Sequence, residues 1–462
     1  MTGRILRIEL RRSAALGIAL LLLVLGAVLL LSSTRFFAGR WMQLAVLARS
    51  TLVVLLPLAL AGGAWLGRRD ARYRVNELFA STVRPRWQRV VPTAGALAVS
   101  VVAAYLLIFL VAVGWVVPTA GYFPGATIVV TAVGVPALVA AAWLGMAAGR
   151  AVPRVITAPV LAVVGFVLVG LVPEWASAPG TGAEIGQPRA EPAGVLLLPA
   201  FTGLDDFQTI ATRVSLLQAL WLVSLAATGL LLLGAVRRRA VAFAVLPALL
   251  GVAVALPLLP AGGARGAAVV DPVAIELVCD NDGPQVCVTR AHAALLPDVV
   301  GPARQALAMM AAKLPNAPIR AVQTQQVTYW ARLTSDAAPP RHSADTVVFD
   351  TPTINWVGRA DLSGDYFLPS LLDAAWRQEC GDQSVRGDVY RARTVATAWL
   401  TGQLPAPHPG SDPAETARLE SAYQALVSLP EVEQRRRVAA AREGALECRD
   451  DELVALLPAD QP

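Results

Sequence analysis

The sequence predicts an α-helical polytopic membrane protein with seven spans, followed by a C-terminal extracytoplasmic domain of the α+β class that is largely helical. Three observations predict this fold class. The 462-residue chain is 55% hydrophobic and only 16% charged, against roughly 25% charge in an average soluble domain. Its long apolar runs all lie before residue 261. Charge is also divided, because residues 1–260 hold 21 arginines and 8 acidic residues, whereas residues 261–462 hold 18 basic and 25 acidic residues.

Seven uncharged apolar runs are candidates for membrane spans, since a helix needs about 20 residues to cross the hydrocarbon core. The first run has basic flanks like those of a signal peptide. Its 19 apolar residues and the lack of a convincing small-residue cleavage site predict a retained helix. The expected spans are residues 13–31, 50–67, 91–117, 126–148, 155–173, 214–236 and 240–260.

The arginines that flank these spans lie mostly on one side. If seven helices alternate in direction, sixteen arginines fall at one end, and only Arg35, Arg40, Arg189 and Arg213 fall at the other, with Arg49 ambiguous. The sixteen are Arg4, Arg7, Arg11, Arg12, the seven arginines of residues 67–90, Arg150, Arg154, Arg237, Arg238 and Arg239. The positive-inside rule places this end and the N-terminus in the cytoplasm. We therefore expect a multi-pass protein of the plasma membrane with its C-terminal domain outside.

All four cysteines lie in the predicted exterior region, which indicates disulfides. Cys279 and Cys287 bracket the sequence DNDGPQV, in which Asp282-Gly283 is a hairpin-turn signal. A bridge between them would close a short two-stranded unit and contribute roughly 2–4 kcal/mol. Cys380 and Cys448 form the second expected pair. Four buried free thiols are the alternative.

The loop between the second and third spans, residues 67–90, has the sequence GRRDARYRVNELFASTVRPRWQRV. Val75, Leu78 and Phe79 have the spacing of a short amphipathic helix, and Pro85 ends that pattern. One interpretation is an interfacial helix on anionic headgroups, where each arginine contributes about 1 kcal/mol. The other is a docking element whose apolar stripe fits a groove on a cytoplasmic partner.

The stretch ELFASTVRPRWQRV resembles the loop between the second and third spans of type-2 ABC exporter permeases. In that family a Gly-Thr pair is followed by Glu-Leu-Leu, Ser-Thr-Pro and a basic turn, and the loop holds a coupling helix that contacts the ATPase subunit. Glu77, Leu78, Ser81 and Thr82 match, and Arg84 to Trp87 stand at the basic turn, whereas Val75-Asn76 and Val83 depart from the pattern. The resemblance implies a partner-binding site in this loop. Its residues are Arg74, Val75, Glu77, Leu78, Phe79, Ser81, Thr82 and Arg84.

The layout extends this resemblance over residues 1–239. Six spans that end in a cytoplasmic arginine cluster match the permease core, as does the long exterior segment before the sixth span. Within that segment, the short apolar run Gly194 to Phe201 resembles the re-entrant exterior helices of the family. The expected organisation is a six-span permease-like domain over 1–239, a seventh helix over 240–260 and an exterior domain over 261–462.

The energy source is expected on another polypeptide. Ionisable residues within spans are the usual sign of proton or ion coupling, and only Arg49 approaches such a position. It lies at the outer edge of the second span, where we expect it to snorkel to the interface. Lys313, the only lysine, is flanked by Ala312 and Leu314, so the chain lacks the Gly-Lys-Ser/Thr of a P-loop.

The C-terminal region is predicted to contain short strands followed by helices. β-Branched runs occur at VAIELVC, VCVT, IRAVQT and TVVFD, and helical periodicity dominates at 291–314, 367–380, 384–402, 413–428 and 430–448. The run RRRVAAAR in the last helix is interpreted as a solvated face, with a partner site as the alternative.

This region is not expected to be an enzyme. No HExxH or Gly-x-Ser-x-Gly motif occurs, so no catalytic or metal-binding residue is assigned. The sequence leaves open a triad of distant residues such as Ser363, His342 and Asp345. Binding of cargo, of a partner protein or of the cell envelope is the expected role.

The sequence is therefore interpreted as the membrane subunit of an ATP-driven exporter, with no cofactor of its own, that moves amphiphilic, peptide or lipid-like cargo outward. The resemblance implies pairing with a second permease subunit, identical or different, and docking of ABC ATPase subunits. The basic pI comes with no nucleic-acid-binding signature, so nucleic acid is not an expected partner. The alternative is a membrane-anchored exterior binding or sensing protein without transport activity.

Overall fold

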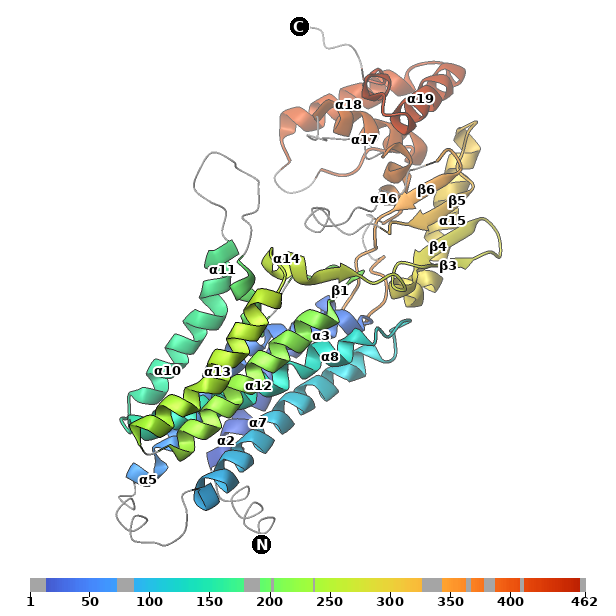
Figure 1. Ribbon diagram of the computed structural model, residues 1–462. Helices are drawn as coiled ribbons and strands as arrows, with labels where there is room; N and C mark the ends of the chain where they lie inside the picture. The colour runs from blue at the N-terminus through green and yellow to red at the C-terminus, as the bar shows by residue number, and fades with distance from the viewer. Residues whose placement is uncertain are drawn as a thin grey trace. The chain divides into compact units, whose positions relative to one another are not determined.

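The computed structural model describes residues 14–72, 87–177, 192–200, 203–235, 237–325, 343–362, 367–377, 387–407 and 411–457. The chain divides into two compact units (Figure 1). The membrane unit consists mainly of the residues up to Asp271, and the C-terminal unit mainly of those from Pro272 onward.

Within the described ranges, six helical spans are long and apolar enough to cross a membrane, and a bent helix pair brings the number to seven. This confirms the predicted fold class. Three spans are interrupted, because α3 and α4 are bent by 41°, α8 continues into α9, and α10 continues through a π-helical turn. The spans are α2 (Ala14–Leu31), α3 (Trp41–Ser50) with α4 (Leu52–Gly67), α7 (Trp87–Val116), α8 (Ala126–Ala132) with α9 (Gly134–Ala151), α10 (Thr157–Phe166) with η2 (Val167–Leu171) and α11 (Val172–Ser177), α12 (Thr212–Gly234) and α13 (Arg238–Leu258).

Helices α4 and α9 pack with their backbones in contact. A methyl group on Gly63 or Gly67 would overlap a carbonyl oxygen of α9, and one on Gly145 or Gly149 would overlap a carbonyl oxygen of α4. Both helices thus contribute a small-x3-small pair, the pattern that lets membrane helices approach closely and gain dispersion energy. The four glycines make this pair the tightest junction that we describe in the membrane unit.

The directions of the spans alternate as predicted. Gly63 lies against the carbonyl of Ala142 and Gly67 against that of Met146, so the contacts advance together and the second and fourth spans run parallel. The end of α12 meets the start of α7, where Gly234 lies against Trp87. Figure 1 shows α5 (Arg69–Arg72) at this same end of the bundle, where α10 and α13 also start.

We call this end of the membrane unit the arginine-rich end. Its described arginines are Arg68, Arg69, Arg72, Arg89, Arg150, Arg154, Arg237, Arg238 and Arg239. The described arginines near the opposite end are Arg35, Arg40, Arg49 and Arg213. The uneven distribution read from the sequence is therefore present in the folded bundle, and the positive-inside rule assigns the arginine-rich end to the cytoplasm as a prediction.

The opposite end is built from short elements between the spans. Strand β1 (Gln208–Ile210), just before α12, pairs antiparallel with β2 (Ala268–Val270), just after α13. Arg40 donates two hydrogen bonds to the carboxylate of Asp206, at 2.9 and 2.7 Å. These contacts connect the start of the second span to the segment before the sixth.

The C-terminal unit has a four-stranded sheet in the order β3-β4-β5-β6. Strands β3 and β4 pair antiparallel, whereas β4, β5 and β6 are parallel, with α15 (Leu296–Lys313) crossing from β4 to β5. The strands are β3 (Leu277–Asp280), β4 (Gln285–Thr289), β5 (Arg320–Gln323) and β6 (Thr346–Phe349). The helices that follow are α16 (Phe367–Asp373), α17 (Gly387–Thr401), α18 (Pro413–Val427), α19 (Glu431–Leu446) and α20 (Asp450–Val454).

One apolar core holds this unit together. Val286, Ala321 and Val347 are neighbours across the parallel strands, and they pack with Trp376 and Val438 from the helical part. The single lysine connects two helices, because Lys313 at the end of α15 donates hydrogen bonds to the carbonyls of Trp399 and Leu400 in the last turn of α17, at 2.6 and 3.0 Å. A cation at a helix C-terminus is stabilised by the helix dipole.

The first three arginines of the run RRRVAAAR in α19 form a solvated face, as expected, but the expectation is wrong for Arg442 at the end of the run, which is buried. Arg435 pairs with Glu431 at 2.6 Å, and Arg436 and Arg437 both pair with Glu433 at 2.8 Å. Hydrogen bonds to its carboxylate, mainly from Arg436 and next from Arg437, lower the pKa of Glu433 to about 2. Arg435, Arg436 and Arg437 are thus paired with carboxylates of their own helix, whereas Arg442 donates to the carbonyl of Ala344 at 2.8 Å.

Candidate functional site

The eight residues predicted to bind an ATPase subunit lie between residues 73 and 86, outside the residues that the structure describes. The structure does describe the helices that lead into and out of this loop. The second span ends at Gly67 and is followed by α5, and the third span begins at Trp87. The loop therefore leaves and re-enters the bundle at the arginine-rich end, and its docking role stays a prediction.

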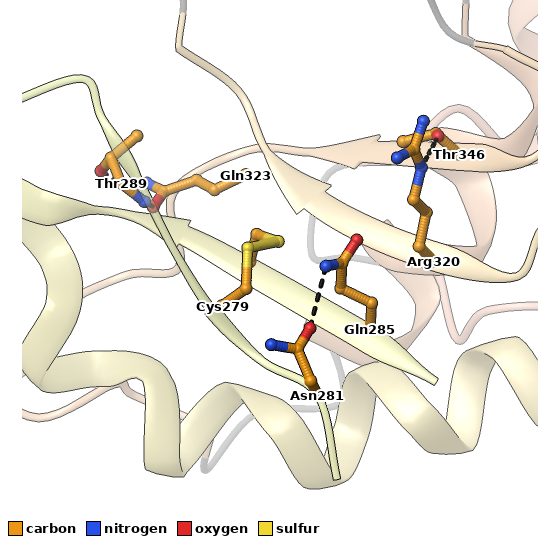
Figure 2. The surroundings of a disulfide bond; sticks show 8 residues. Cys279, Asn281, Gln285, Thr289, Arg320, Gln323 and Thr346 are labelled. Atoms are coloured by element: carbon orange, nitrogen blue, oxygen red, sulfur yellow. Dashed lines mark hydrogen bonds between the residues drawn. A yellow bond between two sulfur atoms is a disulfide. The ribbon is translucent and has the colours of Figure 1, made fainter. Parts of the chain in front are cut away.

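The first predicted disulfide is confirmed. Cys279 and Cys287 are directly opposite each other on β3 and β4 and are joined by a disulfide (Figure 2). The turn between them has the predicted chemistry, because Gly283 adopts a φ of +143°, a conformation that favours glycine. A disulfide is typical of an oxidising compartment, which agrees with an exterior C-terminal unit.

The second predicted pair is only half described. Cys448 is disulfide-bonded, whereas Cys380 lies outside the described residues. The pairing of these two cysteines remains a prediction.

A buried polar cluster occupies the end of the membrane unit opposite the arginine-rich end. Arg49, in the last turn of α3, has no exposed surface, so the expectation that it snorkels to the interface is wrong. Its Nε donates to the carbonyl of Pro199 at 2.8 Å, and its Nη2 donates to Oε1 of Gln218 on α12 at 2.9 Å. Gln218 Nε2 in turn donates to the carbonyl of Leu196 at 2.8 Å. We call Arg49, Gln218 and the carbonyls of residues 196–199 the Arg49 junction.

The bend between α3 and α4 lies directly beside this junction and has a local cause. Ser50 Oγ donates to the carbonyl of Leu47, and Thr51 Oγ1 donates to that of Ala48, both at 2.7 Å. Hydroxyls that bond back to the preceding turn compete with the helical hydrogen bonds and often bend helices. The second span is thus broken at Thr51, between the end of α3 at Ser50 and the start of α4 at Leu52.

The short apolar run before the sixth span does not cross the bundle. Its described part forms η3 (Ala193–Leu197), and Leu196 is buried among Met42, Val214 and Leu217. Carbonyl groups that are removed from water must be satisfied inside the protein. Arg49 and Gln218 supply the donors, which explains why two polar side chains are buried here.

Gln218 was not singled out by the sequence patterns. A signal exists, since a glutamine interrupts the otherwise apolar run of the sixth span. Its partner Arg49 is 169 residues away, so only the fold shows that the two side chains meet.

Removal of Gln218 should destabilise the membrane unit strongly. The variant Gln218→Leu leaves an Arg49 nitrogen and the carbonyl of Leu196 without a partner, and we expect a loss of roughly 2–4 kcal/mol. Thermal unfolding of the purified chain in mild detergent measures this loss. The control is Gln43→Leu, which removes one half-buried hydrogen bond to the carbonyl of Leu204 and should cost about 1 kcal/mol. Equal effects of the two variants would argue against the junction.

The C-terminal unit has its own buried polar network. His292 is 2% exposed, and its Nδ1 lies 2.8 Å from Gln323 Nε2 and 3.1 Å from Thr289 Oγ1. Gln323 also donates to Thr351 at 2.7 Å. Figure 2 shows Gln323 and Thr289 beside each other, where β4 and β5 end. This arrangement is that of a structural histidine, held by side chains from β4 and β5.

The distant triad left open by the sequence is not assembled by the described residues. Ser363 and His342 lie outside them, and only Asp345 is described, just before β6. A hollow of about 310 Å³ lies beside Arg442, whose Nη2 donates to the carbonyl of Ala344 at 2.8 Å. Glu443 and Glu447 also line this hollow, so its lining combines both signs of charge and selects no obvious ligand.

No protein-family model, curated protein or solved structure matches this chain. The fold therefore defines a class only: a multi-span helical membrane protein with a C-terminal unit of mixed α and β structure.

Proposed function

We propose that this chain is the transmembrane subunit of an ATP-driven exporter of the ABC type. A separate ATPase subunit binds the loop of residues 67–90, and the complex moves amphiphilic, peptide or lipid-like cargo outward. The observation that carries the proposal is the resemblance of ELFASTVRPRWQRV to a coupling loop, in a segment that joins the second and third spans at the arginine-rich end. A second permease subunit, identical or different, completes the transport path.

The helix packing supports a route from this loop to the other side of the membrane. Motion of the ATPase subunit reaches α4 directly, because α4 leads into the loop. Helix α9 follows α4, since the interlocked glycines prevent the two helices from sliding independently. The motion ends at the bend beside Arg49, where the Arg49 junction holds the segment that precedes the sixth span.

A membrane-anchored binding or sensing protein is the second candidate. It is favoured by the size of the C-terminal unit, which begins at Pro272 and has its own core. In that case the seven helices mainly anchor the unit.

Affinity purification of the full chain in mild detergent, followed by an ATPase assay, separates the two functions. The exporter proposal requires a nucleotide-hydrolysing subunit that co-purifies in a stoichiometric amount. A chain that purifies alone, without ATPase activity, would favour the binding or sensing protein.

A further inference from the structure

An apolar groove of about 230 Å³ opens on the membrane unit between α2, α4 and α10. It is lined by Ile18 and Leu21 from α2, by Leu58 and Trp65 from α4, and by Ala158 from α10. Leu21 is 49% exposed and Trp65 is 44% exposed, so the groove is open to the surroundings of the helices. In a bilayer those surroundings are lipid.

The groove lies close to the arginine-rich end. Trp65 is in the last turn of α4, Ala158 is the second residue of α10, and Ile18 is in the second turn of α2. The separation of seven positions between Leu58 and Trp65 corresponds to about 10 Å of helix. This length fits within one leaflet of a hydrocarbon core of about 30 Å.

Small residues explain why a hollow remains between these helices. Gly62 brings α4 close to α2, since a methyl group there would lie 2.8 Å from the side chain of Ile18. Next to this close approach, Ala61 and Ala158 are too short to fill the space. The groove is therefore open because Ala61 and Ala158 stand where larger side chains would fill it.

A cationic group stands at the Trp65 end of the groove. The guanidinium carbon of Arg68 lies 4.3 Å from the centre of the Trp65 ring, and Arg68 is only 8% exposed. Among the described residues, its Nη1 has no hydrogen-bond partner. A buried donor without an acceptor is costly. A phosphate oxygen would satisfy it, because guanidinium groups suit phosphate geometry.

We propose that this groove binds an anionic phospholipid of the leaflet at the arginine-rich end. One acyl chain lies against Leu21, Leu58 and Trp65, and the phosphate group accepts hydrogen bonds from Arg68. Tryptophan side chains are enriched at this depth of a membrane, and the guanidinium next to Trp65 supplies the charge complementarity. The inference does not rest on the proposed function, since either transport or anchoring leaves these helices in contact with lipid. Arg68 stands at the start of the loop of residues 67–90 but is not among the eight residues assigned to ATPase docking.

Native mass spectrometry of the full chain, purified with equal amounts of phosphatidylglycerol and phosphatidylcholine, tests the proposal. We expect phosphatidylglycerol to be retained about fivefold over phosphatidylcholine, the preference that one arginine near a membrane surface provides. Arg68→Gln should remove this preference, and Arg68→Lys should keep most of it. The matched control is Arg238→Gln, which removes an exposed arginine at the same end on α13 and should leave the preference unchanged.

A second variant tests the apolar part of the site and serves as well if Arg68→Gln does not fold. Ala61→Phe fills the groove and should lower the retention of both lipids severalfold. The proposal is overturned if the native chain shows no preference between the two headgroups. It is also overturned if Arg238→Gln reduces the preference as much as Arg68→Gln, or if Ala61→Phe leaves lipid retention unchanged.

Discussion

Substitution of both Gly145 and Gly149 by alanine is expected to remove roughly 2–6 kcal/mol of the folding free energy of the membrane unit. Each new methyl group would overlap a backbone carbonyl of α4, and a backbone cannot move aside as a flexible side chain can. Overpacking at one site typically costs about 1–3 kcal/mol, and here two adjacent turns are affected. Thermal unfolding in detergent, together with the yield of monodisperse protein, measures the effect.

A matched control lies on α7. Gly95 and Gly114 have no atoms within 4 Å of an added methyl group, so alanine at both positions meets no obstacle. Because alanine favours a helix over glycine by up to about 1 kcal/mol, this pair should be neutral or slightly stabilising. If both pairs of substitutions changed the thermal stability equally, the result would contradict close packing of α4 on α9.

The double variant Glu77→Arg with Phe79→Asp is expected to lose the ATPase subunit. Arginine reverses the charge that the docking loop offers to its partner, and aspartate places a charge on the apolar stripe. Two contacts worth at least 1.4 kcal/mol each would together reduce the affinity by at least about a hundredfold. The measurement is co-purification of the ATPase subunit with the variant, followed by nucleotide hydrolysis.

A control at the opposite end isolates the effect of the loop. Phe36 on η1 (Thr34–Phe36) is 54% exposed, so Phe36→Asp adds the same charge at an exposed phenylalanine far from the arginine-rich end. It should leave co-purification unchanged. Unchanged co-purification and hydrolysis in the double variant would contradict docking through this loop.

The spans were predictable because each apolar run is by itself long enough to form a helix that crosses the hydrocarbon core. The start of the second span was not, since α3 begins at Trp41 rather than near residue 50. A charged residue such as Arg49 in an apolar run indicates a position at the membrane interface. Arg49 is buried instead because the distant Gln218 and the carbonyl of Pro199 accept its hydrogen bonds. Compensation between residues that are far apart in the sequence is not visible in a window of twenty residues.

The glycine pairs show which part of the helix packing can be predicted from sequence and which part cannot. The spacings of Gly63 with Gly67 and of Gly145 with Gly149 are readable signals for close helix contact. They do not say which helices meet, because that depends on the packing of all seven spans. In the C-terminal unit, the Asp282-Gly283 turn determines the β3–β4 hairpin locally, whereas the parallel pairs depend on the crossover through α15.

We propose that the arginine-rich end and its loop are cytoplasmic, whereas the C-terminal unit is outside. The described part of the chain has no free cysteine, so a single engineered thiol can be labelled against the background of the unmodified chain. In intact cells, a membrane-impermeant thiol reagent should label Glu420→Cys, an exposed position on α18, and should label Ser81→Cys only after permeabilisation. Labelling of Ser81→Cys in intact cells, with Glu420→Cys protected, would show that the chain has the opposite orientation.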